Sequence, residues 1–109
     1  MRKRRIEYEV GSGNVFKDLG LKDSEELLAK AKLASRIIDV IEARKLTQVA
    51  AAKILAVDQP KVSLIYRGRL EDFSIERLMR FLTALGHDLR ITVEAKTRRR
   101  RGRMIVEAA

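Results

Sequence analysis

Three stretches of the chain repeat apolar residues at helical spacing, and shorter stretches at both ends alternate. The first helical stretch, Asp23 to Ala43, carries an apolar stripe made of Leu27, Leu28, Ala31, Ala34, Ile37, Ile38 and Ile41. A third, Ile75 to Leu85, repeats Ile75, Leu78, Met79, Leu82 and Leu85. Asp23 with Glu26 forms a D-x-x-E capping box for the long helix, Ser74 caps the last one, and Gly86 ends it. Residues 15–21 are expected to form a short apolar connector before the first helix.

The middle stretch, Thr47 to Gly68, predicts two short helices joined by a tight turn. Thr47 stands before the helix-forming run Gln48–Leu55, where its hydroxyl can accept an unpaired backbone amide. Asp58 is placed to cap the second helix, with Pro60 in its first turn, where a missing N–H costs nothing. Gly68 is expected to end that helix in a left-handed conformation.

The apolar pattern of this unit fits a helix-turn-helix that packs on itself. Five residues are expected to point inward: Ala52, Leu55, Val57, Val62 and Ile65. The outward face of the second helix then carries Gln59, Pro60, Lys61, Ser63, Leu64 and Arg67. Gln, Ser, Lys and Arg are side chains that contact base edges or phosphates. Two amphipathic helices without a DNA-binding role would give the same spacing, so the pattern alone leaves both interpretations open.

Short alternating stretches at the two ends predict β-strands. Ile6, Tyr8 and Val10 alternate with charged residues before Gly11. Leu89, Ile91, Val93 and Ala95 alternate in the same way near the other end, and residues 104–108 are expected to form a second strand of a C-terminal hairpin. Since a lone hairpin is marginally stable, these strands are expected to pair with the N-terminal strand, a second protomer or a partner protein.

Composition limits the class of protein. The chain has 109 residues, enough for one small domain, and 46% of them are hydrophobic. It has no Cys, so no disulfide framework or thiolate metal site is expected. Without an apolar run long enough for a membrane helix or a signal peptide, a cytoplasmic protein is the default expectation.

The positive charge is concentrated in three places. The net charge is +9, and the basic runs at residues 2–5 (Arg2 to Arg5) and 96–103, which includes Arg98 to Arg101, account for it, because residues 6–95 hold 14 basic and 14 acidic side chains. Within that neutral body, residues 44–69 carry six basic residues and one acid. This local excess coincides with the two short helices and favours a surface that faces phosphates. The basic N-terminal run fits either a DNA-touching arm or a solvated end.

The two short helices resemble the Xre/Cro/phage-repressor family of helix-turn-helix regulators. The resemblance rests on Gln48, Ala52, Gln59 and the Val62-x-x-Ile65 pair. One residue departs from the family: Ala56 stands in the turn where the family usually has Gly, and a left-handed backbone costs a non-Gly residue about 1–2 kcal/mol.

Within that family, residues 14–95 are most similar to the HigA-type antitoxins, through NVFKDLGL, LTQ, QPKVS, RGRLEDFS and ERLMRFLTALGHDLRITV. The resemblance implies a dimer that binds palindromic operators and, in many members, neutralises a toxin encoded beside it. It also implies roles for nine residues: Gln48 and Lys53 on phosphates, Gln59, Pro60, Ser63 and Leu64 on bases, and Lys61, Arg67 and Arg69 on the DNA backbone. Neither arginine-rich run belongs to the matching pattern.

The sequence therefore predicts a mainly α, phage-repressor-like bundle of about four helices with short terminal strands. Its expected parts are a basic arm and strand (1–14), a helix-turn-helix domain (15–86) and a C-terminal hairpin for dimer or partner contact (87–109). The expected function is a transcriptional repressor that binds double-stranded DNA as a homodimer. Each protomer is expected to bind one of two half-sites that lie about 34 Å apart. It is expected to be the antitoxin of a toxin–antitoxin pair that represses its own operon.

Three other functions were weighed against the repressor. A protein-interaction module that mainly neutralises a toxin is compatible with it, although such toxins are commonly basic and so are the termini of this chain. An enzyme is disfavoured, because the single His, His87, has no second His, Cys or Gly-rich phosphate loop to work with. An RNA-binding protein would use the arginine runs, but the few aromatics offer no stacking platform. No cofactor and no metal are expected.

Overall fold

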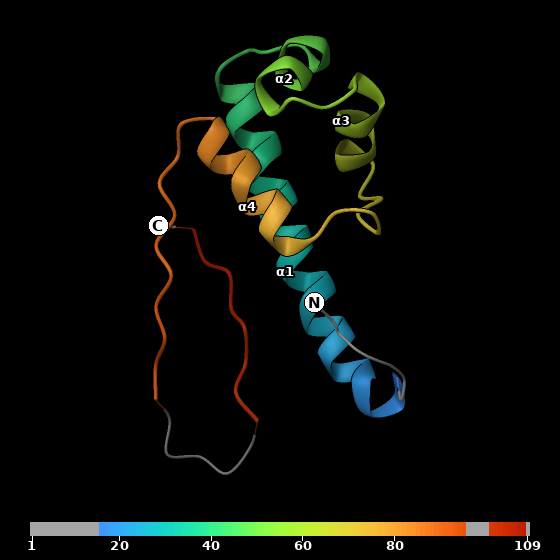
Figure 1. Ribbon diagram of the computed structural model, residues 1–109, viewed down its shortest axis with the longest axis vertical. Helices are drawn as coiled ribbons and strands as arrows, with labels where there is room; N and C mark the ends of the chain where they lie inside the picture. The colour runs from blue at the N-terminus through green and yellow to red at the C-terminus, as the bar shows by residue number, and fades with distance from the viewer. Residues whose placement is uncertain (1–15, 96–100, 109) are drawn as a thin grey trace.

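The computed structural model describes residues 16–95 and 101–108, with side chains from residue 24 onward. Four helices follow one another: α1 Phe16–Ala43, α2 Gln48–Leu55, α3 Gln59–Tyr66 and α4 Ile75–Ala84. Figure 1 shows α1 as one long rod, with α4 lying alongside its second half and α2 and α3 near the same end of the molecule. The mainly α prediction is confirmed for the part of the chain that the structure describes.

Helix α1 begins at Phe16, seven residues before the predicted start at Asp23. The prediction of a connector over residues 15–21 is therefore wrong from Phe16 onward, and the D-x-x-E pair of Asp23 and Glu26 lies inside the helix. Gly20 costs a helix interior about 1 kcal/mol relative to Ala, and the helix continues through it nevertheless.

The buried face of α1 differs from the predicted stripe in its first half. Leu27 and Leu28 are 59% and 56% exposed, and Ala31 is exposed as well. The buried apolar residues of α1 are instead Ala29, Leu33, Ala34, Ile37, Val40 and Ile41. The prediction failed there because α1 is longer than the bundle that packs on it: α4 lies along its second half, and the first half extends beyond (Figure 1).

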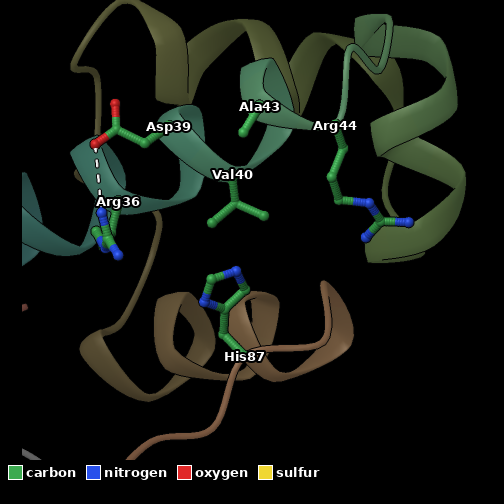
Figure 2. A pocket seen from close by; sticks show the side chains of 6 residues that line it. All are labelled: Arg36, Asp39, Val40, Ala43, Arg44 and His87. Carbon is green, nitrogen blue, oxygen red and sulfur yellow. Dashed lines mark ion pairs between the residues drawn. The ribbon is translucent and has the colours of Figure 1, made fainter. Parts of the chain in front are cut away.

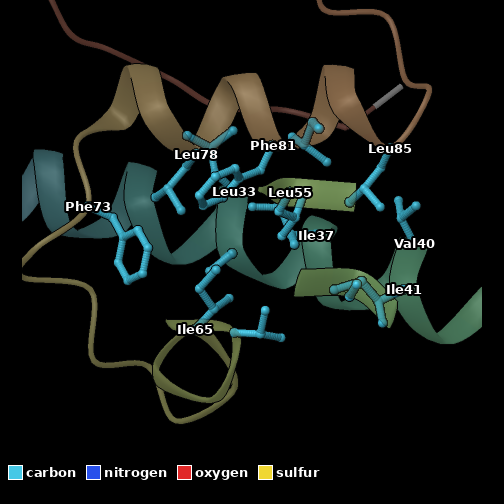
Figure 3. Packing of buried hydrophobic residues seen from close by; sticks show 14 of the residues in the cluster. Leu33, Ile37, Val40, Ile41, Leu55, Ile65, Phe73, Leu78, Phe81 and Leu85 are labelled. Carbon is cyan, nitrogen blue, oxygen red and sulfur yellow. The ribbon is translucent and has the colours of Figure 1, made fainter. Parts of the chain in front are cut away.

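The core forms where the second half of α1 meets the other three helices. Figure 3 shows Ile37 and Ile41 of α1 facing Leu55 of α2 and Ile65 of α3. Leu78 on α4 is completely buried at the same place. Burial of a full-sized apolar side chain stabilises a fold by about 1.5–3 kcal/mol, so this one cluster holds the short helices in place.

Before α4, an aromatic pair fixes the loop that arrives from α3. The Ser74 hydroxyl accepts a hydrogen bond from the Arg77 amide at 3.0 Å, which confirms the predicted cap. Phe73 is buried and meets Phe81 edge to face at 6.0 Å between ring centroids. The Arg77 guanidinium lies 5.2 Å from the Phe73 ring centre and 5.5 Å from that of Phe81, so the charge caps both rings.

All four helices end through a residue with positive φ, at Lys45, Ala56, Gly68 and Gly86. At each end, the amide of the following residue bonds back five residues, as Arg69 N–H does to Leu64 O at 2.9 Å. This is the Schellman arrangement, which favours glycine at the left-handed position. Gly68 and the stop at Gly86 are confirmed, whereas no glycine marks the end of α1 at Lys45.

After α4, the chain runs in extended segments that form no strand within the described residues. Residues 87–95, orange in Figure 1, lead away from the end of α4. Residues 101–108, drawn in red, run back in the opposite direction. The strands predicted at 88–96 and 104–108 are thus not formed where the structure describes them, since no described segment pairs with them as a strand and a two-stranded ribbon is marginal alone. Val106 packs against the core, and the Arg101 guanidinium pairs with Glu25 of α1 at 3.1 Å.

Several predictions lie outside the described residues. These are the N-terminal strand and the basic run from Arg2 to Arg5, the remainder of the 1–14 arm, and the middle of the arginine run at 98–100.

Candidate nucleic-acid interface

Helices α2 and α3 form the predicted two-helix unit, with boundaries close to those expected. The Thr47 hydroxyl accepts a hydrogen bond from the Ala50 amide at 3.0 Å, which confirms Thr47 as the cap of α2. Asp58 precedes α3 as expected, but its side chain makes no capping bond. Pro60 stands in the first turn of α3, where its fixed φ suits a helix start.

The turn between the helices is built on a left-handed alanine. Ala56 has φ 59° and ψ 45°, and its amide bonds to Lys53 O at 3.2 Å. The next amide, of Val57, bonds to Ala52 O at 3.0 Å. The turn therefore has the geometry for which glycine is usual, with alanine held in it by two backbone hydrogen bonds and by the packing of Val57 on the core.

One face of α3 is anchored in the core. Val62 and Ile65 are 0% and 2% exposed, as the inward pattern predicts. Leu64, which the resemblance assigned to the bases, is half-buried and packs against the core, and so does Tyr66. The opposite face begins with two exposed residues, Gln59 and Pro60, and Lys61 and Ser63 are half-exposed.

A hydrogen bond joins the starts of the two helices. The Gln59 side-chain amide donates to Gln48 Oε1 at 2.8 Å, and the bond is exposed. The two residues are eleven apart in sequence and sit at the first position of α3 and α2 respectively. The bond therefore sets the direction of the Gln59 amide on the outer surface of the unit.

The cations around this unit are available to a charged partner. Within the described residues, Lys53, Lys61 and Arg67 make no ion pair, and Lys53 and Arg67 are exposed. Arg69 lies 3.9 Å from the Glu71 carboxylate, with both side chains well exposed, so that pair is weak. Arg44 is different, because its guanidinium donates to Leu85 O at 3.1 Å and so ties the end of α1 to the end of α4.

Tyr66, which sequence reasoning did not single out, is the one described group with a clear pKa change. Burial raises the pKa of its phenol above the ordinary value of 10.0, and the Glu42 carboxylate raises it further. Tyr66 ends α3 and Glu42 lies in the last turn of α1, so this contact marks where the two helices meet. In the sequence, the one indication was that Tyr66 is an aromatic residue at the end of a helix with polar residues beside it.

A shallow open cavity of about 210 Å³ lies on another part of the surface (Figure 2). It is lined by Arg36, Asp39, Val40, Ala43, Arg44 and His87. His87 is exposed and faces Val40 in Figure 2, and Arg36 pairs with Asp39 at 3.8 Å. The described residues contain no group of three His, Cys, Asp or Glu that would hold a metal ion.

None of the described helices is both long enough and apolar enough to cross a membrane.

Helices α2 and α3 are joined by a tight turn, and α3 buries its inner face in the core while its outer face is open. This arrangement defines a helix-turn-helix protein. The family model for the helix-turn-helix domain matches residues 15–94. The solved structure of a protein named as an XRE family transcriptional regulator is 44% identical, with a TM-score of 0.73 over 80% of this chain and 99% of that one. No curated protein matches.

The chain belongs to the helix-turn-helix domain family, and its relative of known structure places it with the XRE regulators. This membership supports DNA-binding transcriptional regulation as its class of function, in a family that is typically non-enzymatic.

Proposed function

We propose that this protein is a sequence-specific repressor that places α3 in the major groove of its operator. The observation that carries the proposal is the Gln48–Gln59 bond, which orients an exposed amide at the first position of α3. An α-helix fits the major groove of B-DNA, and the first residues of the second helix are those that reach base edges in this class.

The hydrogen-bonding capacity left on Gln59 matches adenine. The bond to Gln48 uses one of the two N–H groups of the Gln59 amide, which leaves one N–H donor and the carbonyl oxygen. Adenine presents N7 as an acceptor and its N6 amino group as a donor in the major groove, the complement of that pair. Gln59 is therefore the residue we assign to direct base contact, with Ser63 one turn further along the helix.

The unpaired cations supply the contacts that do not depend on sequence. Lys53, Lys61 and Arg67 carry no ion pair within the described residues, so a phosphate does not have to displace an internal partner. Each neutralised phosphate releases counterions and makes the affinity fall with salt. Gln48 keeps its own amide N–H groups, which are free to donate to a phosphate while its oxygen holds Gln59.

One α3 helix covers too few base pairs to mark an operator in a genome. We therefore propose a twofold dimer on a palindromic site, with half-sites about 34 Å apart, or one turn of DNA. The C-terminal segment is the proposed contact region between the protomers.

The test is a titration on the promoter DNA upstream of the gene and on a shuffled duplex, at two salt concentrations. Gln59→Ala should cost about 1–3 kcal/mol on promoter DNA, roughly 5- to 150-fold, and leave shuffled DNA almost unaffected. Lys53→Ala is the matched control: it should weaken both complexes alike and lower the salt slope by about one. Equal losses on both duplexes for Gln59→Ala would contradict direct base contact.

An antitoxin role is the second candidate, and one surface favours it. In the returning C-terminal segment, Met104 and Ile105 are 44% and 56% exposed, so about half of each of these neighbouring apolar side chains is open. We propose that a toxin encoded beside the gene covers this segment, in line with the HigA-type resemblance. Co-expression of both genes tests it: a stable complex that Ile105→Asp abolishes supports the role, and a homodimer free of the neighbouring protein argues against it.

A further inference from the structure

The open cavity of Figure 2 lies apart from the DNA-facing helices. Its volume is about 210 Å³, and its lining comes from α1 and from His87, which follows α4. Among the described residues, none of those that line it belongs to α2 or α3. Because a cavity of about 150 Å³ holds one benzene molecule, this space has room for a compound with a single ring.

Four of the lining residues share one face of α1. Arg36, Val40, Ala43 and Arg44 follow the i, i+4, i+7, i+8 spacing that brings side chains to the same side of a helix. Val40 is buried and, together with Ala43, forms an apolar floor. Arg36 and Arg44 are eight residues apart, or about 12 Å along the helix axis, so a cation lies at each end of this floor.

His87 lies on the side of the cavity opposite to the apolar floor. Its backbone amide donates to Leu82 O at 3.0 Å, so the end of α4 fixes the backbone that carries the imidazole. Figure 2 shows the imidazole facing Val40, with Arg36 on one side and Arg44 on the other. An imidazole stacks on flat aromatic rings, so a ring in this space would contact both the imidazole and the apolar floor.

The charges around the cavity favour a ligand with a single negative charge. Two arginines and one aspartate line it, so the positive charge exceeds the negative. The Asp39 carboxylate lies 3.8 Å from the Arg36 guanidinium and offsets its charge. Arg44 forms no ion pair within the described residues, and its Nη1 donates to Leu85 O at 3.1 Å. That bond orients the Arg44 guanidinium and leaves its other N–H groups to donate to an anion.

We propose that this cavity binds a small aromatic carboxylate. The Arg44 guanidinium donates to the carboxylate in charge-assisted hydrogen bonds, and the ring lies between His87 and the apolar floor. The ligand thereby bridges α1 and the residue that follows α4, and it stabilises the folded protein in proportion to its occupancy. The site is separate from the α3 surface, so both free and DNA-bound protein can take up the ligand.

Titration of the ¹⁵N-labelled full chain with benzoate, followed by amide NMR, tests the site. Benzoate should cause saturable shifts at the amides of Ala43, Arg44 and His87, with a Kd of about 1 mM or tighter. Benzamide keeps the ring without the charge, and acetate keeps the carboxylate without the ring. Each should bind at least about tenfold more weakly than benzoate.

Three results of this titration would overturn the proposal. Benzamide that binds as tightly as benzoate would exclude recognition of the carboxylate, and acetate that binds as tightly would exclude recognition of the ring. Shifts that do not saturate, or that centre on residues away from the cavity, would exclude the site itself. The DNA-binding proposal would be untouched by such a failure, because the two sites share no residue.

Two variants separate the parts of the site. His87→Ala removes the stacking surface of an exposed residue and should weaken benzoate binding about fivefold or more without altering the fold. Arg44→Gln should weaken it at least about tenfold, and its unfolding midpoint is measured alongside because the bond to Leu85 O is also lost. Arg80→Gln is the matched control, since this exposed arginine of α4 lies outside the cavity lining and should bind as the wild type does. Wild-type affinity for benzoate in His87→Ala would overturn the proposal even if Arg44→Gln did not fold.

Discussion

The left-handed alanine in the turn between α2 and α3 makes a prediction with an unusual sign: Ala56→Gly should stabilise the protein. Substituting glycine elsewhere in a helix costs about 1 kcal/mol. At Ala56 the backbone has φ 59°, where an L-residue with a Cβ loses about 1–2 kcal/mol relative to glycine. Glycine also makes the unfolded chain more flexible, and this entropy lowers the stability of the folded state by about 0.4–1 kcal/mol, which offsets part of the gain.

The net gain therefore lies between about 0 and 1.6 kcal/mol. Its midpoint of about 0.8 kcal/mol raises the Tm of a domain of this size by about 3–6 °C. Both hydrogen bonds of the turn come from backbone amides, so the substitution leaves them in place. Urea and thermal unfolding followed by circular dichroism measure the change. Lys45→Gly, at φ 56°, should give a similar gain by the same cause.

Ala31→Gly is the matched control, since Ala31 is exposed within α1 and has ordinary helical surroundings. It should lower stability by about 1 kcal/mol. If Ala56→Gly lowers stability by the same amount, the turn does not hold its alanine in the left-handed conformation, and the argument fails.

Three further predictions follow from the same structure. Thr47→Ala should destabilise the protein by about 1 kcal/mol in urea unfolding, because the Ala50 amide loses its partner; an unchanged midpoint would contradict the cap. Leu78→Ala should cost about 2–5 kcal/mol, because its side chain is fully buried; a loss below 1 kcal/mol would mean that the site is not tightly packed. The raised pKa of Tyr66 favours the neutral phenol in the folded state, so this contribution is fully present below pH 10 and is lost as pH rises through the folded pKa. Unfolding titrations from pH 9 to 11.5 should show a steeper loss for the wild type than for Tyr66→Phe, and parallel curves would refute it.

The helix-turn-helix boundaries were predictable because their signals are local. Thr47, Pro60 and Gly68 act within one turn of their own positions, and the structure places each where the pattern requires. The left-handed Ala56 was predictable only by comparison with the glycine usual in that turn. Lys45 adopts the same conformation with no glycine to mark it, so local sequence carried no warning.

The features that sequence did not predict depend on the size and arrangement of the whole bundle. Leu27 and Leu28 fit a helical stripe, but whether they are buried depends on how far α4 extends along α1. The half-burial of Leu64 likewise follows from the tilt of α3 in the core, which spacing does not define. The contact between Gln48 and Gln59 spans eleven residues and requires the angle between two helices. Residues 89–95 do alternate, but a strand needs a partner, and no segment among the described residues pairs with them.

The most direct test of the account is selection of binding sites from a pool of random DNA duplexes by the wild-type protein and by Gln59→Ala. The account predicts that the wild type enriches an inverted repeat whose half-site centres are about 10–10.5 base pairs apart. It also predicts that Gln59→Ala still binds but loses the preference for adenine at one position in each half-site. Enrichment of no common sequence by the wild type, or of an identical sequence by both proteins, would contradict the claim that α3 reads DNA through Gln59.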